Sequence, residues 1–335
     1  MRRSPILMGA LAALAIAAAA AVAGGPAGPE APSVVLVTRD CASRNFICPG
    51  FVQAARRTGT RARIVSPDPR EDIAATFAVL AQQEHDLVIA GFDLALELGA
   101  AAERFPDARF AVIDVPLGLD RPRNVAVLEF RPAEAAYLAG WLAARMERLR
   151  RGADVVGAVG GDIVPPVDDF IGAYWEGARR AVPGIRVLVG YARSFTDPNA
   201  CAAVAERQIA RGAGTVFDVA GGCGPGTLRT ARAAGVWAIG VDRDRSGLGP
   251  HILTSVVKRY DRGFALLMRQ AGDDRLPPGR GIVLDLRRGG AELGRISPRV
   301  PGRVLRELAA VRQAIVRGRI QVPGVGIQVP GVGLS

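Results

Sequence analysis

The sequence predicts an α/β protein with two doubly wound parallel-sheet lobes. Short runs of β-branched and aliphatic residues alternate with helical segments along the 335-residue chain. The runs are apolar throughout, which is typical of strands buried on both faces of a parallel sheet. The alternation stops at one long helical segment, residues 131–151, and then restarts. Two sheets of similar size are therefore expected, one before and one after this segment.

The first lobe begins with SVVLVT at residues 33–38, a short β-branched run that predicts a buried strand. A loop to about Pro49 and a helix from Gly50 are expected next. The alternation then continues through strand 61–66, helix 71–84, strand 86–91, helix 93–104 and strands 109–114 and 124–130.

The long segment 131–151 carries large apolar side chains on one helical face: Leu138, Leu142, Met146 and Leu149. Beyond it the predicted strands are 154–160, 185–191, 215–221 and 236–242, with helices between them. In such sheets the binding sites lie beyond the carboxyl ends of the strands. In a two-lobed protein those ends can face each other across a cleft.

The two ends of the chain depart from this pattern. Residues 1–23 are typical of a secretory signal peptide, with Arg2 and Arg3 ahead of an apolar run and a small-residue cleavage site. An uncleaved anchor is the alternative, although the run is only weakly apolar. Residues 24–32 are rich in Gly and Pro and predict a linker. At the other end, IQVPGVG occurs twice, and we expect residues 324–335 to be a disordered tail.

A signal peptide places the mature protein in the periplasm or on the outer side of the cell envelope. No cysteine lies near the predicted cleavage point, so there is no acceptor for the usual bacterial lipid attachment. Removing Arg2 and Arg3 lowers the formal net charge from +11 to +9. The remaining basic residues are scattered without interleaved aromatic residues, a pattern that argues against nucleic-acid binding.

Four cysteines in an exported chain indicate two disulfides. Three pairings are possible. One of them joins Cys41 to Cys48, which closes a short loop, and Cys201 to Cys223, which ties the start of a helix to the next loop. Neither pair has CxxC spacing and the chain has only two histidines, so we expect no metal site and no cofactor.

Several polar or ring-bearing residues fall at predicted strand ends. Asp114 and Asp242 end strands, and a Gly-rich loop begins at Gly221. Three phenylalanines lie in loops just past strand ends: Phe46, Phe92 and Phe195. A strand-end Asp can instead cap the next helix, and a loop Phe can close the edge of a lobe. The Gly-rich loop matches neither GxGxxG nor a P-loop, but its glycines would let the backbone approach a ligand closely.

Lys258 is the only lysine among the 43 lysines and arginines of the chain. Arg is a planar fork and Lys a compact point charge, so a single Lys is a candidate for a site that needs an ammonium group. The alternative is a surface lysine retained by chance.

Long stretches of the chain resemble the basic membrane protein family, the purine-nucleoside-receptor-like solute-binding proteins of ABC transporters. The matching stretches occur in order from about Ser33 to Pro323. They include FAVIDV, NVAVLEFRPAEAAYLAG, VVGAVGGDIVPPVDDFIGAYWEGA, VLVGYARSFTDP, VFDVAGGCG, AIGVDRDRS and ILTSVVKRYD. The resemblance implies a type I periplasmic-binding-protein fold with a hinge. The N-terminal lobe would comprise residues 33–128 and about 256–285, and the C-terminal lobe 129–255 and about 286–323.

The resemblance also implies a ligand site in the cleft between the lobes. The positions of this chain that match the family's site residues are Phe46, Asp114, Phe195, Gly221, Asp242 and Lys258. Phe92 and Phe217 are secondary candidates that could equally belong to the core. The polar residues would hold a sugar and a base, and the rings would sandwich the base.

Three departures from the family pattern concern the ligand. The first loop reads RDCASRNFIC, with Ile47 after the Phe where the family has Asn. Asp168 and Asp169 stand where the family often has basic residues; they would favour a cationic ligand or form a solvated surface pair. Cys223 replaces a small polar residue, which the resemblance explains by a bond to Cys201.

The expected function is that of a monomeric extracytoplasmic receptor. It would deliver a nucleoside-like ligand, a purine nucleoside by preference, to an ABC permease and its ATPase. Its only contact with the membrane would be through the permease. The alternative is a sensor that reports to a membrane signalling partner. No catalytic motif is evident, and His85 and His251 read as ordinary loop residues, so we do not expect an enzyme.

Overall fold

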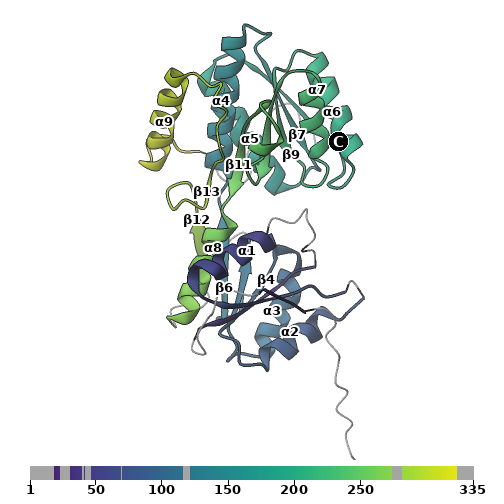
Figure 1. The fold of residues 1–335 in the computed structure, drawn as a ribbon, viewed down its shortest axis with the longest axis vertical. Coiled ribbons are helices and arrows are strands. Elements are labelled where there is room, and N and C mark those ends of the chain that lie inside the picture. Colours follow the sequence, from purple (N-terminus) through teal and green to yellow (C-terminus); the bar gives the residue numbers. More distant parts are fainter. Residues whose placement is uncertain are drawn as a thin grey trace, which may run out of the picture.

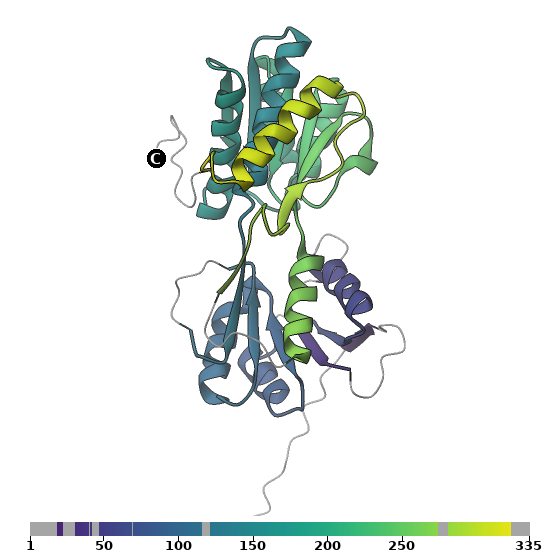
Figure 2. The same ribbon diagram turned by 90° about the vertical axis from the view of Figure 1, so that its left-hand side faces the viewer.

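The computed structural model describes residues 19–22, 31–39, 41, 47–68, 70–115, 121–273 and 281–322. These residues form two lobes that lie end to end and meet at a narrow waist (Figures 1 and 2). Each lobe is a mainly parallel sheet with helices on both faces. The predicted two-lobed α/β fold is confirmed.

The first sheet contains mostly parallel strands in the order β1-β3-β2-β4-β5-β6-β12. They are β1 (Ala19–Val22), β2 (Ser33–Val37), β3 (Arg61–Val65), β4 (Leu87–Ala90), β5 (Phe110–Ile113), β6 (Val125–Phe130) and β12 (Gly281–Leu284). Only β1, the end of the predicted signal peptide, is antiparallel to its neighbour, β3.

Successive residues of β2 point to opposite faces of this sheet, and both faces are buried. Val34 and Leu36 pack with helices α1 (Ile47–Thr58) and α8 (Tyr260–Gly272). Val35 and Val37 pack with α2 (Ile73–Ala81) and α3 (Ala95–Arg104). Burial on both faces is why the strand reads as an uninterrupted apolar run.

The second sheet has the order β13-β11-β10-β9-β7-β8. Its strands are β7 (Val155–Gly160), β8 (Arg186–Tyr191), β9 (Thr215–Val219), β10 (Trp237–Asp242), β11 (Ile252–Lys258) and β13 (Ala291–Leu293). Helices α4 (Ala133–Arg150), α5 (Pro165–Ala181) and α9 (Gly302–Val316) belong to the core on one face. Helices α6 (Pro198–Ala210) and α7 (Pro225–Ala233) cover the other.

Two glycines allow α4 and α5 to pack with their backbones in contact. A Cβ on Gly140 would lie 1.9 Å from the carbonyl oxygen of Tyr174. A Cβ on Gly177 would lie 1.9 Å from the carbonyl oxygen of Tyr137. Larger residues at these positions would push the helices apart, so the core of the second lobe depends on both glycines.

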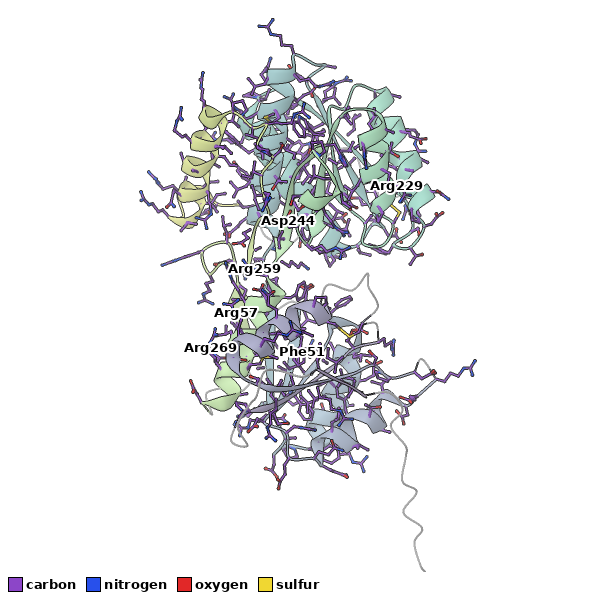
Figure 3. The ribbon with its side chains drawn as sticks, in the orientation of Figure 1. Phe51, Arg57, Arg229, Asp244, Arg259 and Arg269 are labelled. Atoms are coloured by element: carbon purple, nitrogen blue, oxygen red, sulfur yellow. A yellow bond between two sulfur atoms is a disulfide. The ribbon has the colours of Figure 1, made fainter. Side chains whose placement is uncertain are left out.

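The chain passes between the lobes in three places, after β6, after β11 and after β12. The first and third connections meet where the N–H of Arg131 donates to Leu284 O, 3.0 Å away. The second and third meet where the N–H of Arg259 donates to Gly290 O at 2.8 Å. Figure 3 shows Arg259 at the waist. Its guanidinium donates to both carboxylate oxygens of Asp261, each at 2.7 Å, and to Glu292.

The structure differs from the sequence prediction at some element boundaries. Helix α1 begins at Ile47 and so includes Pro49 in its first turn. Proline is tolerated there because the N–H that it lacks would have no partner within the helix. The short 3₁₀ helix η1 (Phe92–Leu94) precedes α3 where one helix was expected. Helix α2 begins at Ile73, after Asp72, whose side chain accepts from the N–H groups of Ala74 and Ala75.

The cysteines form two disulfides, Cys41–Cys48 and Cys201–Cys223. This is the pairing singled out in the sequence. The predicted tail and most of the predicted signal peptide and linker lie outside the described residues, as does Phe46. In the part of the chain that is described, no helix combines the length and the apolar character needed to cross a membrane.

Candidate functional site

Two aspartates stand where the carboxyl ends of the two sheets face the waist. Asp114 follows the fully buried strand β5, and Asp242 ends β10. Both have left-handed backbone conformations, with φ of 64° and 67°. Asp tolerates this region better than most residues because its short polar side chain bonds locally. An aspartate can therefore occupy the left-handed position at each strand end.

Lys258 ends β11 of the second sheet and reaches Asp114 at the edge of the first. Its Nζ lies 2.9 Å from Oδ1 and 2.8 Å from Oδ2 of Asp114. The two side chains are only 12% and 14% exposed. Asp242 is paired in register with Val257, the neighbour of Lys258. The three polar residues suggested by the resemblance thus come together in one cluster at the waist.

The charges of this cluster are coupled, with Lys258 favouring ionised Asp242 and Asp114 opposing it. Burial lowers the pKa of Lys258, but the carboxylates of Asp114 and Asp242 offset this effect and leave the pKa raised, so the ammonium is charged. Burial raises the pKa of Asp242, with a further contribution from Asp114, and Lys258 opposes the rise. The cluster holds two carboxyl groups around one ammonium. Lys258 engages both oxygens of Asp114, so Asp242 is the carboxyl group better placed to accept from a ligand.

Two further side chains contact the Lys258–Asp114 pair, and sequence reasoning missed both. The hydroxyl of Tyr260, the first residue of α8, donates to Oδ2 of Asp114. Burial and the two aspartates raise the pKa of Tyr260, which keeps its proton. The ring of Phe170 lies 5.6 Å from Nζ of Lys258. In the sequence, only their positions could have pointed to these two residues. Tyr260 is two residues after Lys258, and Phe170 follows the acidic pair Asp168–Asp169.

Phe195 lies over glycines at the carboxyl edge of the second sheet. A Cβ on Gly161 would lie 2.4 Å from its ring, and one on Gly221, which has φ of 54°, would lie 3.9 Å from it. The side chain is 42% exposed. The glycines thus allow the ring to lie against the backbone while much of it stays open to solvent. That is the arrangement a stacking platform requires.

The remaining aromatic candidates separate into different environments. Phe217 is fully buried, 5.1 Å from the ring of Tyr174 between ring centroids, and belongs to the core. Phe92 is 53% exposed at the start of η1, beyond β4. Phe46 lies outside the described residues, so the structure does not place it.

The acidic pair at the start of α5 is half-buried rather than a freely solvated surface pair. Oδ1 of Asp168 accepts from the hydroxyl of Tyr191 at 2.6 Å. Burial and this bond raise the pKa of Tyr191, which therefore remains a donor. Asp168 is thus bonded within its own lobe.

A third buried carboxyl group lies in the neighbouring strand β9. Asp218 in β9 is fully buried; its Oδ1 accepts from the N–H of Ala220, and its Oδ2 has no partner among the described residues. Burial raises the pKa of Asp218 to about 7, with Arg245 opposing and Asp242 reinforcing the rise. Charge on Asp218 is therefore coupled to the carboxyl group of Asp242 at the strand end.

The described residues contain no group of His, Cys, Asp and Glu side chains that could hold a metal ion. The two histidines lie away from the cluster. His85 bonds Ser33 Oγ at 2.9 Å and Gln83 Oε1 at 3.0 Å, and His251 immediately precedes β11, at the strand end opposite Lys258. The cluster can accept and donate hydrogen bonds around a ligand.

Comparison with known families gives one match over most of the chain. Residues 44–325 match the family described as ABC transporter substrate-binding protein PnrA-like. Among curated proteins, the chain is similar to the ABC transporter nucleoside-binding protein BmpA of Lactococcus lactis subsp. cremoris. The identity is 27% over 286 residues, which cover 80% of this chain and 79% of the relative. It is also 30% identical to basic membrane protein B of Borreliella afzelii over 191 residues, 55% of each chain.

Solved structures share the fold at low sequence identity. The chain is similar to an ABC transporter solute-binding protein of Aeropyrum pernix K1, with a TM-score of 0.73 and 22% identity. The likeness covers 87% of this chain and 94% of that one. At 22% identity this likeness shows that the two proteins share the two-lobed fold.

Proposed function

The chain belongs to the PnrA-like family of ABC transporter substrate-binding proteins, and from this premise we propose that it binds a nucleoside-like ligand between its lobes for import. Such a receptor binds a small molecule outside the cytoplasm and hands it to a membrane permease driven by an ATPase. We propose a purine nucleoside as the preferred ligand and binding without turnover. We also propose that the receptor acts as a monomer, because each lobe supplies part of the site.

The observation that carries the proposal is the cluster of Asp114, Asp242 and Lys258 between the lobes. A ribose offers two neighbouring hydroxyl groups, which donate well to a carboxylate. Asp242 is the carboxyl group that can accept them, while Lys258 and Tyr260 hold Asp114 in place. A ligand bound there would contact both lobes.

The exposed ring of Phe195 supports a planar base as the other half of the ligand. Stacking of a base on an aromatic ring contributes about 1–3 kcal/mol. The ring rests on Gly161 and Gly221, so it is already positioned before a ligand arrives. Preorganisation of this kind lowers the entropy cost of binding.

The lobes provide the mechanism that couples binding to transport. Three short connections join them, so a hinge motion at the waist changes the distance between the two sheet edges. A ligand that contacts both edges binds the closed form better and shifts the open–closed equilibrium toward it. The permease would then distinguish the closed, loaded receptor from the open one.

A thermal-shift screen of the purified protein against nucleosides, free bases, sugars and amines tests the ligand. A compound that binds only the folded state raises the melting temperature in proportion to RT ln(1 + [L]/Kd). We expect guanosine, adenosine or inosine to give the largest shifts. If all three leave the melting temperature unchanged while another class raises it, the nucleoside assignment is wrong.

Uptake by cells tests the role in transport. Deleting the gene should reduce uptake of a labelled nucleoside that binds in the thermal-shift screen. If the nucleoside binds and uptake is unaffected, the import role is wrong, and a sensor that reports the ligand to a signalling partner becomes the better account.

A further inference from the structure

A surface groove of about 670 Å³ lies at the end of the second lobe that is remote from the waist. Trp237, the first residue of β10, lines it, whereas Asp242 at the other end of the same strand belongs to the cluster. Five steps along a strand separate the two sites by about 17 Å. Ligand sites of this fold lie at the carboxyl edge, so the groove is distinct from the site described above.

The walls of the groove combine apolar and basic side chains. Met146 and Leu149 come from the last turns of α4, and Trp237 begins β10. Leu149 is 53% exposed although it is a large aliphatic residue. The guanidinium groups that line the groove belong to Arg150, Arg232 and Arg299. His251 also lines it, and none of the described lining residues is acidic.

The positive charge of the groove is only partly neutralised. Arg150 donates to both oxygens of the buried carboxylate of Glu147, at 2.9 and 3.0 Å. Arg232 and Arg299 are exposed, and neither forms an ion pair with any other described residue. Two guanidinium groups therefore leave a local excess of positive charge. Burial lowers the pKa of His251, and the positive charge of the nearby Arg232 lowers it further.

Arg299 is held against the aromatic wall of the groove. Its Cζ lies 4.7 Å from the ring centroid of Trp237. A stacked guanidinium keeps its N–H donors directed outward in its own plane, where they can bind an anion. His251 also lines the groove; its ring bonds the backbone of Leu228, and its Nδ1 is buried and has no hydrogen-bond partner among the described residues. Polar groups and an apolar surface thus converge on one space.

We propose that this groove is a second binding site, for a small organic anion with a flat apolar body, such as an aromatic carboxylate or sulfonate. The apolar body would lie against the exposed Leu149, and the anionic group would bind Arg232 and Arg299, the second of which is supported by the ring of Trp237 (9% exposed). The volume is within the range of small-molecule sites. Because the groove is basic and apolar together, a neutral apolar compound and a simple inorganic anion would each satisfy only half of it.

The test uses two fluorescent probes that differ in one charge. Anilinonaphthalene-8-sulfonate carries a sulfonate, and N-phenyl-1-naphthylamine is the same ring system without it. Both become fluorescent in apolar surroundings, so each can be titrated into the full-length protein. We expect the sulfonate probe to bind at one site, at least tenfold more tightly than the neutral probe.

Variants locate the site. Arg299→Gln and Arg232→Gln should each raise the Kd of the sulfonate probe about fivefold to tenfold and leave the neutral probe unchanged. Leu149→Ser should weaken both probes. Arg269→Gln is the matched control, since Arg269 is exposed on α8 of the other lobe (Figure 3) and should change neither Kd. Melting curves establish that each variant is folded.

Two results would overturn the proposal: equal affinity for the charged and neutral probes, or a sulfonate affinity that survives both arginine substitutions. The result is also separable from the nucleoside proposal. Asp242→Ala should remove nucleoside binding and leave the sulfonate probe unchanged, whereas Arg299→Gln should do the reverse.

Discussion

The ammonium group of Lys258 binds both carboxylate oxygens of Asp114, at 2.8 and 2.9 Å, although the two residues extend from different sheets. The pair is largely buried and joins the lobes directly. A guanidinium at this position would be longer and planar, and it would not fit the same compact space between a carboxylate, the hydroxyl of Tyr260 and the ring of Phe170. This geometry explains the one lysine in a chain that otherwise uses arginine.

The pair should couple strongly in stability. Lys258→Met leaves the largely buried carboxylate of Asp114 without its counter-charge, and we expect the free energy of unfolding to fall by about 3 kcal/mol. Asp114→Asn in the same chain should restore part of this loss, because no unpaired charge then remains. Urea denaturation of the single and double variants measures the coupling. Strictly additive losses would show that the pair contributes nothing.

Asp242→Ala should abolish the nucleoside-induced rise in melting temperature without unfolding the protein. The carboxyl group is our proposed acceptor for ribose hydroxyls, and Ala leaves their hydrogen bonds unmade. The exposed Glu206 on α6 offers a control, and Glu206→Ala should keep the full shift. A normal shift in Asp242→Ala would exclude this aspartate from the site.

Phe195→Ala should weaken nucleoside binding by about 1–3 kcal/mol, which is roughly fivefold to 150-fold in Kd, because the base loses its stacking surface. Phe195→Trp should keep most of the affinity. Gly161→Ala provides an independent check, because its Cβ would lie 2.4 Å from the ring of Phe195 and must displace it. Calorimetric titration compares the three variants. Unchanged affinity in both Phe195→Ala and Gly161→Ala would contradict the platform.

The two disulfides should differ in their contribution to stability. Cys201–Cys223 closes a loop with a sequence separation of 22, and Cys41–Cys48 one of 7. In the chain-entropy account, the longer loop stabilises by about 3.4 kcal/mol and the shorter by about 2.5 kcal/mol. We expect the double replacement Cys201→Ser and Cys223→Ser to lower the free energy of unfolding more than the corresponding replacement at Cys41 and Cys48. The reverse order would show that strain or residual structure outweighs loop entropy.

Asp218 should make stability depend on pH near neutrality. Its pKa in the folded protein is raised to about 7, above the unfolded value of about 4. The folded state therefore holds the proton more tightly, so the stabilisation is complete below pH 4 and is lost as the pH rises through 7. Asp218→Asn, which cannot ionise, should be more stable than the natural protein at pH 8 and should flatten the profile between pH 4 and 7. Denaturation at several pH values tests this, and an identical profile in the variant would rule Asp218 out.

Much of the candidate site could be read from the chain because its residues lie at places that local pattern identifies. Asp114 and Asp242 follow apolar runs, and the carboxyl ends of buried parallel strands are where such sheets bind ligands. The cysteine count indicated two disulfides, and composition isolated Lys258. Each of these signals comes from neighbouring residues or from simple counts. Such signals do not depend on how the lobes are arranged.

Other features depended on which segments meet in space. Lys258 and Asp114 are 144 residues apart and belong to different sheets, so no local pattern could pair them. The burial of Phe217, the bond from Tyr260 and the basic groove around Trp237 likewise arise from packing between distant elements. Apolar periodicity determines which face of a strand or helix is buried, because it acts over a few residues. The relative placement of the two sheets determines which charges face one another, because those contacts form only when the lobes are joined at the waist.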